Sequence, residues 1–352
     1  MKAMILAAGL GTRLRPLTHL VSKPMMPLVG RPCLEHALRL LKKYGVEDMA
    51  VNLHYLPQQI KDYFGDGSAF GVNINYSLEK ELMGTAGGFK KLQPFFERDT
   101  SLIISGDALT DLDLEAFYRF HKEKGCLATL ALKRVANPQD YGVVKLEGDY
   151  KIQVFQEKPP REEAVSNLAN TGIYLFEPEV FDYIEPGVFY DFGSQLFPRF
   201  IEEGIPLAGY PMEGYWCDIG NLDIYREAHY DILTRQARVD IPGKRITDNI
   251  WLGDRVSIHP QAKIVGPLFI GDNSVIDKGA EIYGPVALEK NTFVGKDSLV
   301  KRSILWEGAR VEEKAQVIDS ILAQGAGTGT GEIWEGEVIM PPGFNLEDRK
   351  EG

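Results

Sequence analysis

Hydrophobic and polar positions divide the chain into two stretches with different periods. In the first stretch, short apolar runs such as residues 4–7 and 101–105 alternate with segments whose apolar residues recur at helical spacing, such as residues 32–44. Apolar runs of this length are typical of buried strands, and the helical spacing is typical of helices with one buried face. The alternation of the two predicts an α/β domain with a mixed, mainly parallel sheet.

The same pattern places the other elements of this domain. Further strands are expected at residues 48–53, 72–77 and 127–132, and further helices at residues 57–64, 114–124 and 221–235. Ligands of such sheets lie at the carboxyl ends of the strands. The segments that follow residues 4–7 and 101–105 are therefore candidates for a ligand site.

The second stretch has a period of six, which neither a strand nor a helix keeps on one face. The large apolar residues at this spacing are Leu252, Ile258, Ile264, Ile270, Ile276, Ile282, Leu288, Val294, Val300 and Trp306. A hexapeptide repeat predicts a left-handed parallel β-helix, a triangular coil in which each hexad forms one side. The phase of the repeat slips by one residue at Val311 and resumes at Val317.

Turn-forming residues at 241–244 mark a linker between the two stretches. The sequence therefore predicts a first domain over residues 1–238, a β-helix domain over residues 245–324 and a tail over residues 325–352. Within the tail, the glycine-rich segment 325–331 and the charged end are expected to be loose or to depend on a partner.

Composition and charge narrow the class of protein. The chain has 352 residues, of which 44% are hydrophobic and 25% charged, as in a soluble globular protein. Its net charge of −11 argues against a broad nucleic-acid surface. The 3 cysteines are far apart, which fits a reducing cytoplasm and neither a disulfide framework nor a zinc site. The N-terminus is not that of a signal peptide, and no apolar run of ~18 residues predicts a membrane span.

A glycine-rich loop follows directly after the first strand. It contains Gly9 and Gly11, then Thr12 and Arg13, with Lys23 ten residues further on. Glycines after a strand let backbone N–H groups approach a ligand, and a nest of such groups binds anions. The two cations supply positive charge for phosphate oxygens. The loop lacks the residues of a Walker A loop and of the dinucleotide fingerprint, and by itself it is also compatible with an ordinary strand-to-helix turn.

Two carboxylates, those of Asp107 and Glu157, are candidates for binding a metal ion and a sugar. Asp107 follows the strand at 101–105, where a carboxylate can bind a hard cation such as Mg²⁺. Glu157 can accept two sugar hydroxyls, and the adjacent Lys158 can reach a phosphate. Taken alone, Asp107 is also typical of a turn before a helix, and the Glu-Lys pair of an exposed turn before prolines.

Taken together, these segments resemble a known signature. The string GLGTRLRPLT at residues 9–18, followed by Lys23-Pro24, resembles that of the sugar-nucleotidyltransferases, which join a nucleoside triphosphate to a sugar 1-phosphate. Further segments carry the same likeness, namely LMGTAG (82–87), GDA (106–108), EKP (157–159), NTGIY (170–174) and GYWCDIGN (214–221). The resemblance covers nearly the whole chain and implies a Rossmann-like nucleotidyltransferase domain.

The resemblance also implies roles for individual residues. Nucleotide-binding residues would be Leu6, Ala7, Ala8, Gly9, Gly11, Thr12, Arg13, Gly84, Thr85 and Ala86. Sugar-phosphate-binding residues would be Gly142, Glu157, Lys158, Asn170 and Thr171, and catalytic residues Arg13, Lys23, Asp107 and Lys158. Asp107 and Asp218 would hold Mg²⁺. No general base is needed, because the second pKa of the attacking phosphate is ~6.

The closest likeness is to bacterial mannose-1-phosphate guanylyltransferases, which predicts GTP and mannose 1-phosphate as substrates and GDP-mannose as product. The alternative is UTP or dTTP with glucose 1-phosphate. Two alternatives from other classes stay open, namely a non-catalytic regulatory relative and a hexapeptide acyltransferase. An acyltransferase would need a base, and the only histidine of the repeat is His259. We expect no nucleic-acid or membrane partner, and a homo-oligomer formed through the β-helix.

Overall fold

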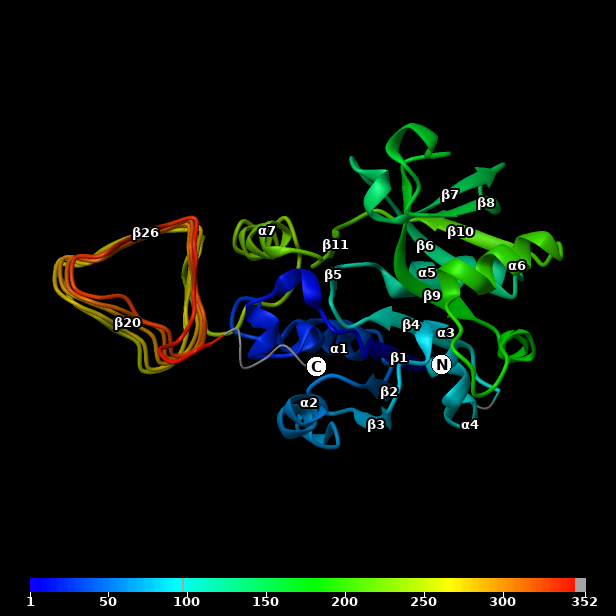
Figure 1. Cartoon of the computed structure of the whole chain (residues 1–352), viewed down its shortest axis with the longest axis horizontal. Coiled ribbons are helices and arrows are strands. Elements are labelled where there is room, and N and C mark those ends of the chain that lie inside the picture. The colour runs from blue at the N-terminus through cyan, green and yellow to red at the C-terminus, as the bar shows by residue number, and fades with distance from the viewer. Residues whose placement is uncertain (97, 346–352) are drawn as a thin grey trace. The chain divides into compact units, whose positions relative to one another are not determined.

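The computed structural model of the chain describes residues 1–96 and 98–345. Its contacts divide the chain into two compact units, whose elements are labelled in Figure 1. The first unit comprises Met1–Leu10 and Leu34–Asp218, and the second comprises Gly11–Cys33 and Ile219–Gly352. The glycine-rich loop is therefore divided between the units after Leu10. The domain boundaries expected near residues 238 and 245 stay a prediction.

A mixed sheet forms the centre of the first unit, in the order β3-β2-β1-β4-β9-β6-β10-β8-β7. Its strands are β1 (Lys2–Ala7), β2 (Asp48–Leu53), β3 (Asn73–Leu78), β4 (Ser101–Ser105), β6 (Ala128–Arg134), β7 (Gly142–Glu147), β8 (Lys151–Glu157), β9 (Leu168–Phe176) and β10 (Leu207–Pro211). The part from β3 to β4 is parallel. Beyond it most ladders are antiparallel, because β7 and β8 form a hairpin and β9 runs against both β4 and β6. Parallel pairing therefore dominates only the half of the sheet from β3 to β4, whereas a mainly parallel sheet was expected.

The four expected helices lie close to their expected positions, and the helices at residues 84–91, 93–96 and 197–202 were not expected from the sequence. They are α1 (Cys33–Lys43), α2 (Pro57–Phe64), α3 (Gly84–Lys91), α4 (Gln93–Phe96), α5 (Leu114–Lys124), α6 (Phe197–Glu202) and α7 (Leu222–Leu233). Helix α5 matches its expected range because both ends carry local signals. Asp113 accepts a hydrogen bond from the N–H of Ala116, and Gly125 ends the helix at φ 60°. Among the described residues, no helix combines the length and apolar composition that crossing a membrane requires.

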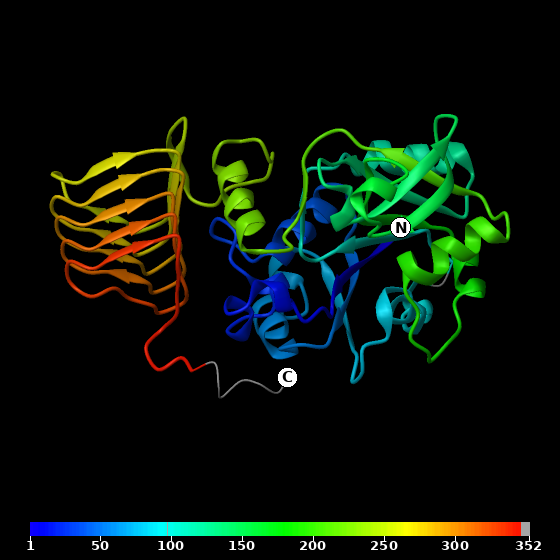
Figure 2. The ribbon, with the colours of Figure 1, turned by 45° about the horizontal axis from the view of Figure 1, so that its top comes forward.

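The second unit contains a coil of parallel strands over residues 250–339, which fits a β-helix. Figure 1 shows its triangular outline and Figure 2 its stacked turns. One side consists of β13 (Ile250–Leu252), β16 (Leu268–Ile270), β19 (Val286–Leu288), β22 (Ile304–Leu305), β25 (Ile321–Leu322) and β27 (Val338–Ile339). The second side consists of β14 (Ser257–Ile258), β17 (Val275–Ile276), β20 (Phe293–Val294) and β23 (Arg310–Val311). The third side consists of β15 (Lys263–Val265), β18 (Glu281–Tyr283), β21 (Leu299–Lys301), β24 (Gln316–Ile318) and β26 (Ile333–Glu335). The antiparallel strand β12 (Lys244–Thr247) precedes the coil beside β13.

The pairing of the coil corrects one detail of the expected repeat. The slip expected at Val311 occurs one hexad earlier, because Leu288 pairs with Leu305 rather than with Trp306. Leu305 belongs to the interior of the coil. Trp306 is also buried, but its indole N–H donates to the hydroxyl of Tyr225 on α7. Both residues are large and apolar, so the period alone did not distinguish them.

The segment after Ala323 is more regular than expected. Strands β26 and β27 pair in parallel with β24 and β25 and so extend the coil to Ile339. Ala326 is buried in the coil interior, while Gly325 has a φ of 68°. Glycine fits such turn positions at little steric cost, which is why a glycine-rich composition here does not prevent regular structure. Most of the charged end, residues 346–352, lies outside the described residues.

Candidate active site

The first half of the glycine-rich loop lies at the carboxyl end of β1, where Ala7 is the last strand residue. The N–H of Ala7 donates a hydrogen bond to Oδ1 of Asn52 at 2.8 Å. A Cβ atom at Gly9 would meet no heavy atom of the described residues within 4 Å, and Gly9 does not have a positive φ. Neither packing nor conformation therefore requires glycine at position 9. The open space at Gly9 is compatible with the predicted close approach of a ligand.

The second half of the loop belongs to the second unit. It folds into 3₁₀ turns at η1 (Thr12–Leu14), η2 (Leu17–His19) and η3 (Lys23–Met25). Gly11 has a φ of 66°, and a Cβ atom there would lie 3.0 Å from Cβ of Lys23 and 3.1 Å from Cγ2 of Thr18. The fold of the loop therefore requires Gly11, in contrast to Gly9. Arg13 is exposed and Lys23 is half-buried.

The segment at residues 82–88 leads into α3. A Cβ atom at Gly84 would lie 2.4 Å from the carbonyl oxygen of Tyr190. The same carbonyl accepts the N–H groups of Ala86 and Gly87, both at 2.9 Å. These small residues thus make room for the chain at residues 188–190, a packing role that the sequence analysis missed. The predicted contacts of Gly84, Thr85 and Ala86 with a nucleotide stay a prediction.

A buried polar network, also missed from the sequence, joins the end of β1 to residues 82–88. Asn52 donates from Nδ2 to Oε1 of Glu79 at 2.8 Å, and Oε2 of Glu79 accepts the N–H of Met83 at 3.1 Å. Because Asn52 also accepts the N–H of Ala7, one chain of hydrogen bonds holds both predicted nucleotide-binding segments. An Asn within the apolar run of β2 was the signal in the sequence that could have revealed it.

Glycines flank the carboxylate of Glu157. This residue ends β8 directly opposite Gly142, the first residue of β7. A Cβ atom would lie 2.9 Å from Oε2 of Glu157 if placed at Gly142, and 2.8 Å if placed at Gly193. Burial raises the pKa of Glu157, the nearby Lys158 lowers it, and Asp191 raises it further. The two glycines therefore let the carboxylate of Glu157 pack against the backbone, while 41% of its side chain stays exposed.

Lys158 follows directly and is held in an uncommon backbone conformation. Its φ is 47°, and its N–H donates to the carbonyl of Tyr141 at 3.1 Å. A residue with a side chain adopts this left-handed region only where its surroundings impose it. The ammonium lies 4.0 Å from Oε1 of Glu157 and is well exposed. A cation in this position can reach an anionic group of a bound ligand.

The next two predicted residues, on β9, differ in their surroundings. Asn170 is half-buried; its Nδ2 donates to the hydroxyl of Tyr174 at 2.9 Å, and its Oδ1 accepts the N–H of Gly172 at 3.2 Å. Thr171 is buried, and its hydroxyl donates to the carbonyl of Ala131 at 2.7 Å. The Thr171 side chain therefore serves the sheet, whereas Asn170 remains partly accessible.

Of the two predicted metal carboxylates, Asp218 ends a strand and Asp107 lies in the turn directly before the strand that pairs with it. Asp218 ends β11 (Trp216–Asp218), which pairs antiparallel with β5 (Ala108–Thr110). It lies directly opposite Ala108, one register step from Asp107. The hydroxyl of Ser105 donates to Oδ1 of Asp107. Carboxylate oxygens are the protein ligands that Mg²⁺ prefers, so the donor set fits this ion. Among the residues that the structure describes, no group of three or more His, Cys, Asp or Glu side chains could hold a metal.

Most predicted site residues thus fall in the first unit, at the carboxyl end of β1 or along β7, β8 and β9. Leu6 is half-buried, and Ala7 and Ala8 are buried. Thr12, Arg13 and Lys23 belong to the second unit. The assignment of binding and catalytic roles to all these residues stays a prediction.

Comparison with known proteins identifies the family. Residues 2–235 match the nucleotidyl transferase family. A UTP–glucose-1-phosphate uridylyltransferase from Synechocystis is 41% identical over 92% of this chain and 87% of its own length. A mannose-1-phosphate guanylyltransferase from Mycobacterium tuberculosis is 34% identical over 66% of this chain and 64% of its own length.

A solved structure agrees with these relatives. The crystal structure of a Bacillus anthracis protein assigned as a glucose-1-phosphate thymidylyltransferase is 27% identical, with a TM-score of 0.61. It matches 70% of this chain and 98% of its own length. The chain therefore belongs to the nucleotidyl transferase family, among the enzymes that join a nucleoside triphosphate to a sugar 1-phosphate.

Proposed function

We propose that this chain transfers a uridylyl group from UTP to glucose 1-phosphate, forming UDP-glucose and pyrophosphate. The observation that carries the proposal is the Synechocystis relative, whose name specifies this reaction and whose match covers 92% of the chain. A match of that extent includes much of the C-terminal coil as well as the first unit. UTP with glucose 1-phosphate, which the sequence suggested as the alternative pair of substrates, is therefore the leading candidate.

The second candidate is guanylyl transfer from GTP to mannose 1-phosphate, the pair expected from the sequence. The Mycobacterium tuberculosis relative supports it, at 34% identity over 66% of the chain. Guanine carries an N2 amino donor that uracil lacks. A site built to pair this donor leaves an acceptor unpaired when uracil binds, which costs about 1–3 kcal/mol, or roughly ten- to a hundredfold in specificity.

Both candidates share one chemical step. An oxygen of the sugar phosphate attacks the α-phosphorus of the triphosphate, and the bond from this phosphorus to the bridging oxygen of pyrophosphate breaks. The attacking phosphate is already largely ionised at neutral pH, since its second pKa is ~6. The work of the protein is therefore to position the substrates and to neutralise their charge.

Each predicted residue has a role in this proposal. Glu157, whose side chain is 41% exposed, accepts hydroxyls of the sugar, and the half-buried Asn170 also binds the sugar. Lys158 binds the sugar phosphate, while Arg13 and Lys23 bind phosphate oxygens of the triphosphate. Asp107 and Asp218 would hold Mg²⁺, which when bound neutralises charge on the phosphate oxygens.

The finer features of the architecture belong to the same proposal. A register offset of 18 residues, as between Ile250 and Leu268, supports three six-residue sides per turn, the repeat of the predicted left-handed β-helix. Such a coil would also serve the formation of a homo-oligomer. Cys33, Cys126 and Cys217 form no disulfide with one another, which supports a reducing compartment such as the cytoplasm.

One panel tests the proposal. Purified protein is offered UTP, GTP, dTTP or ATP with either glucose 1-phosphate or mannose 1-phosphate, and pyrophosphate release is followed. The proposal expects the highest kcat/KM for UTP with glucose 1-phosphate. A preference of tenfold or more for GTP with mannose 1-phosphate would establish the second candidate instead. If no pair released pyrophosphate, the chain would be the regulatory relative, and acetyl-CoA binding would be measured to test for an acyltransferase.

A further inference from the structure

The end of the glycine-rich loop forms a small hairpin at residues 26–33. Pro27 and Pro32 form a β-bridge, and the N–H of Leu28 donates to the carbonyl of Arg31 at 2.6 Å. At its tip, Val29 has a φ of 51° and is fully buried. A β-branched residue is a genuine outlier in this region of backbone conformation and persists only where the surroundings over-determine it. The conformation of the tip therefore depends on what packs around it.

The surroundings of the tip come from the C-terminal coil and the linker before it. The N–H of Gly30 donates to Oε1 of Glu289 at 2.8 Å. A Cβ atom at Gly30 would lie 2.6 Å from the ring of Phe269 and 2.6 Å from Cγ of Pro242. Glu289 is 6% exposed, so the hydrogen bond is shielded from water. Only a glycine fits here, and the buried carboxylate is positioned to satisfy its N–H.

Helix α7 makes a second connection from the coil to the same hairpin. The indole N–H of Trp306 donates to the hydroxyl of Tyr225 at 2.9 Å, and this hydroxyl donates to the carbonyl of Pro27. Nε2 of His229 lies 3.1 Å from the same carbonyl. All three side chains are buried. A relay of hydrogen bonds thus runs from the coil through α7 to the first residue of the hairpin bridge.

The hairpin is continuous with the residues predicted to bind phosphate. Lys23 begins η3, and its carbonyl accepts the N–H of Met26 at 3.2 Å. Displacement of Pro27 would therefore shift Lys23 through a short, hydrogen-bonded piece of chain. Groups that stabilise charge in a transition state must be held closely, since misplacement by ~1 Å can cost about a hundredfold in rate.

We propose that the C-terminal coil is a positioning element for nucleotidyl transfer. Glu289 and the Trp306–Tyr225 relay hold the hairpin at residues 26–33, and through it the loop that carries Arg13 and Lys23. This inference rests on the proposed function, since it assigns the coil a task in that reaction beyond assembly. None of these three residues contacts substrate; each acts through the loop.

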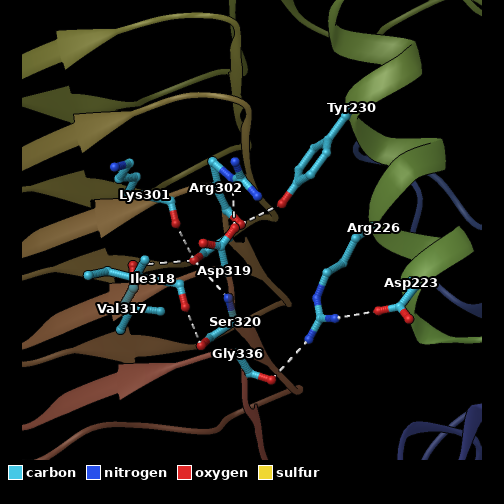
Figure 3. A network of polar contacts seen from close by, with 11 residues as sticks. Asp223, Arg226, Tyr230, Lys301, Arg302, Val317, Ile318, Asp319, Ser320 and Gly336 are labelled. Carbon is cyan, nitrogen blue, oxygen red and sulfur yellow. Dashed lines mark hydrogen bonds and ion pairs between the residues drawn. The ribbon is translucent and has the colours of Figure 1, made fainter.

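Other contacts between α7 and the coil provide a matched control (Figure 3). The hydroxyl of Tyr230 donates to the carbonyl of Arg302 at 2.5 Å, and Nη2 of Arg226 donates to the carbonyl of Gly336 at 3.3 Å. Nε of Arg302 in turn donates to Oδ1 of Asp319 at 2.6 Å. These bonds also join α7 to the coil, but their partners lie outside the hairpin.

The first experiment compares Tyr225→Phe with Tyr230→Phe in the full-length protein. Each change removes one hydroxyl that bonds to a carbonyl from the same helix. The inference expects kcat to fall at least about fivefold in Tyr225→Phe and to stay unchanged in Tyr230→Phe, with both measured below the melting temperature of either variant. Equal kcat values in the two variants would overturn it.

A second pair tests the buried carboxylate. Glu289→Gln keeps an acceptor for the N–H of Gly30, whereas Glu289→Ala removes it. We expect kcat to fall in Glu289→Ala and to be restored in Glu289→Gln. If the two variants lost the same activity, the hydrogen bond would not be the reason for the loss, and the positioning role of Glu289 would be rejected.

Amide hydrogen exchange separates this inference from the proposed function. Exchange over residues 11–33 should be faster in Tyr225→Phe and Glu289→Ala than in wild type and Tyr230→Phe, whichever substrates the enzyme uses. If wild type turned over no substrate pair, the proposed function would fail. The exchange result would still test whether Glu289 and Tyr225 hold the loop at residues 11–33. Unchanged exchange in this segment would overturn the inference even in an active enzyme.

Discussion

Asp218 lies directly opposite Ala108 in the antiparallel ladder of β11 and β5, and so one register step from Asp107. The two carboxylates are separated by more than a hundred residues of chain, yet the strands bring their backbones side by side. Backbone proximity of this kind is necessary for two carboxylates to share a divalent cation.

We therefore expect Asp107→Asn and Asp218→Asn to abolish turnover while the fold is retained. Each change removes one anionic ligand and should weaken binding of Mn²⁺, used as a probe for Mg²⁺ and followed by calorimetry. Asp113→Asn is the control, because Asp113 caps α5 and Asn caps a helix equally well. Unchanged metal affinity in both variants would contradict the shared site.

Gly9 and Gly11 should respond differently to the same substitution. Gly9→Ala meets no steric obstacle, so the melting temperature should stay unchanged while KM for the nucleoside triphosphate rises. Gly11→Ala introduces a side chain at φ 66°, 3.0 Å from Cβ of Lys23, and should lower stability as well as activity. Thermal unfolding and steady-state kinetics of both variants check this. Equal effects of the two changes would count against the distinction.

Glu157→Gln is expected to raise KM for the sugar 1-phosphate more than KM for the triphosphate. The loss of hydrogen bonds to a charged group is worth about 1.5–3 kcal/mol, which corresponds to roughly ten- to a hundredfold. Glu162→Gln is the control, since Glu162 is exposed nearby in the sequence. An equal rise of both KM values would show that Glu157 is not selective for the sugar side.

Glu289 gives a prediction for the pH dependence of stability. Burial raises the pKa of this carboxyl from 4.5 to about 7, and Glu307 contributes to the rise. The N–H of Gly30 and the ammonium of Lys290 act in the opposite direction. The buried Tyr225 also faces the carboxyl. An acid whose pKa is raised by folding stabilises the fold below the unfolded value of 4.5, and this contribution is lost as the pH rises through 7.

Relative to wild type, Glu289→Gln should therefore gain stability as the pH increases. The difference between the two free energies of unfolding should grow between pH 4.5 and 7 and approach about 3 kcal/mol above that range. Urea unfolding at several pH values measures it. A difference independent of pH would show that the carboxyl does not titrate in this range.

The corrected register of the coil is also testable. Leu305 lies in the coil interior, so Leu305→Ala should lower the free energy of unfolding by about 2–5 kcal/mol. Ile246→Ala is the matched control, because Ile246 is exposed. A loss at Leu305 no larger than that at Ile246 would argue that the residue does not fill the interior.

The sequence by itself determined those features that depend on local repetition. The spacing of six specified the coil, because a chain that turns at regular intervals must place an apolar residue inward on each side. Asp113 and Gly125 specified the ends of α5 through bonds within a few residues. The apolar run before Gly9 specified a strand, whereas ligand binding by the turn after it stays a prediction, as do the metal-binding roles that the family signature implies for the aspartates at 107 and 218.

Only the tertiary structure decided which distant residues meet. The period allowed either Leu305 or Trp306 inside the coil, and the pairing with Leu288 selected Leu305. Glu289 looked like any charged residue of the repeat, yet it is buried against Gly30. Such choices depend on how separate segments of the chain pack together, and the energy of a buried contact depends on both partners at once. The pattern of one segment indicates which of its side chains are buried, but not which distant residues pack against them.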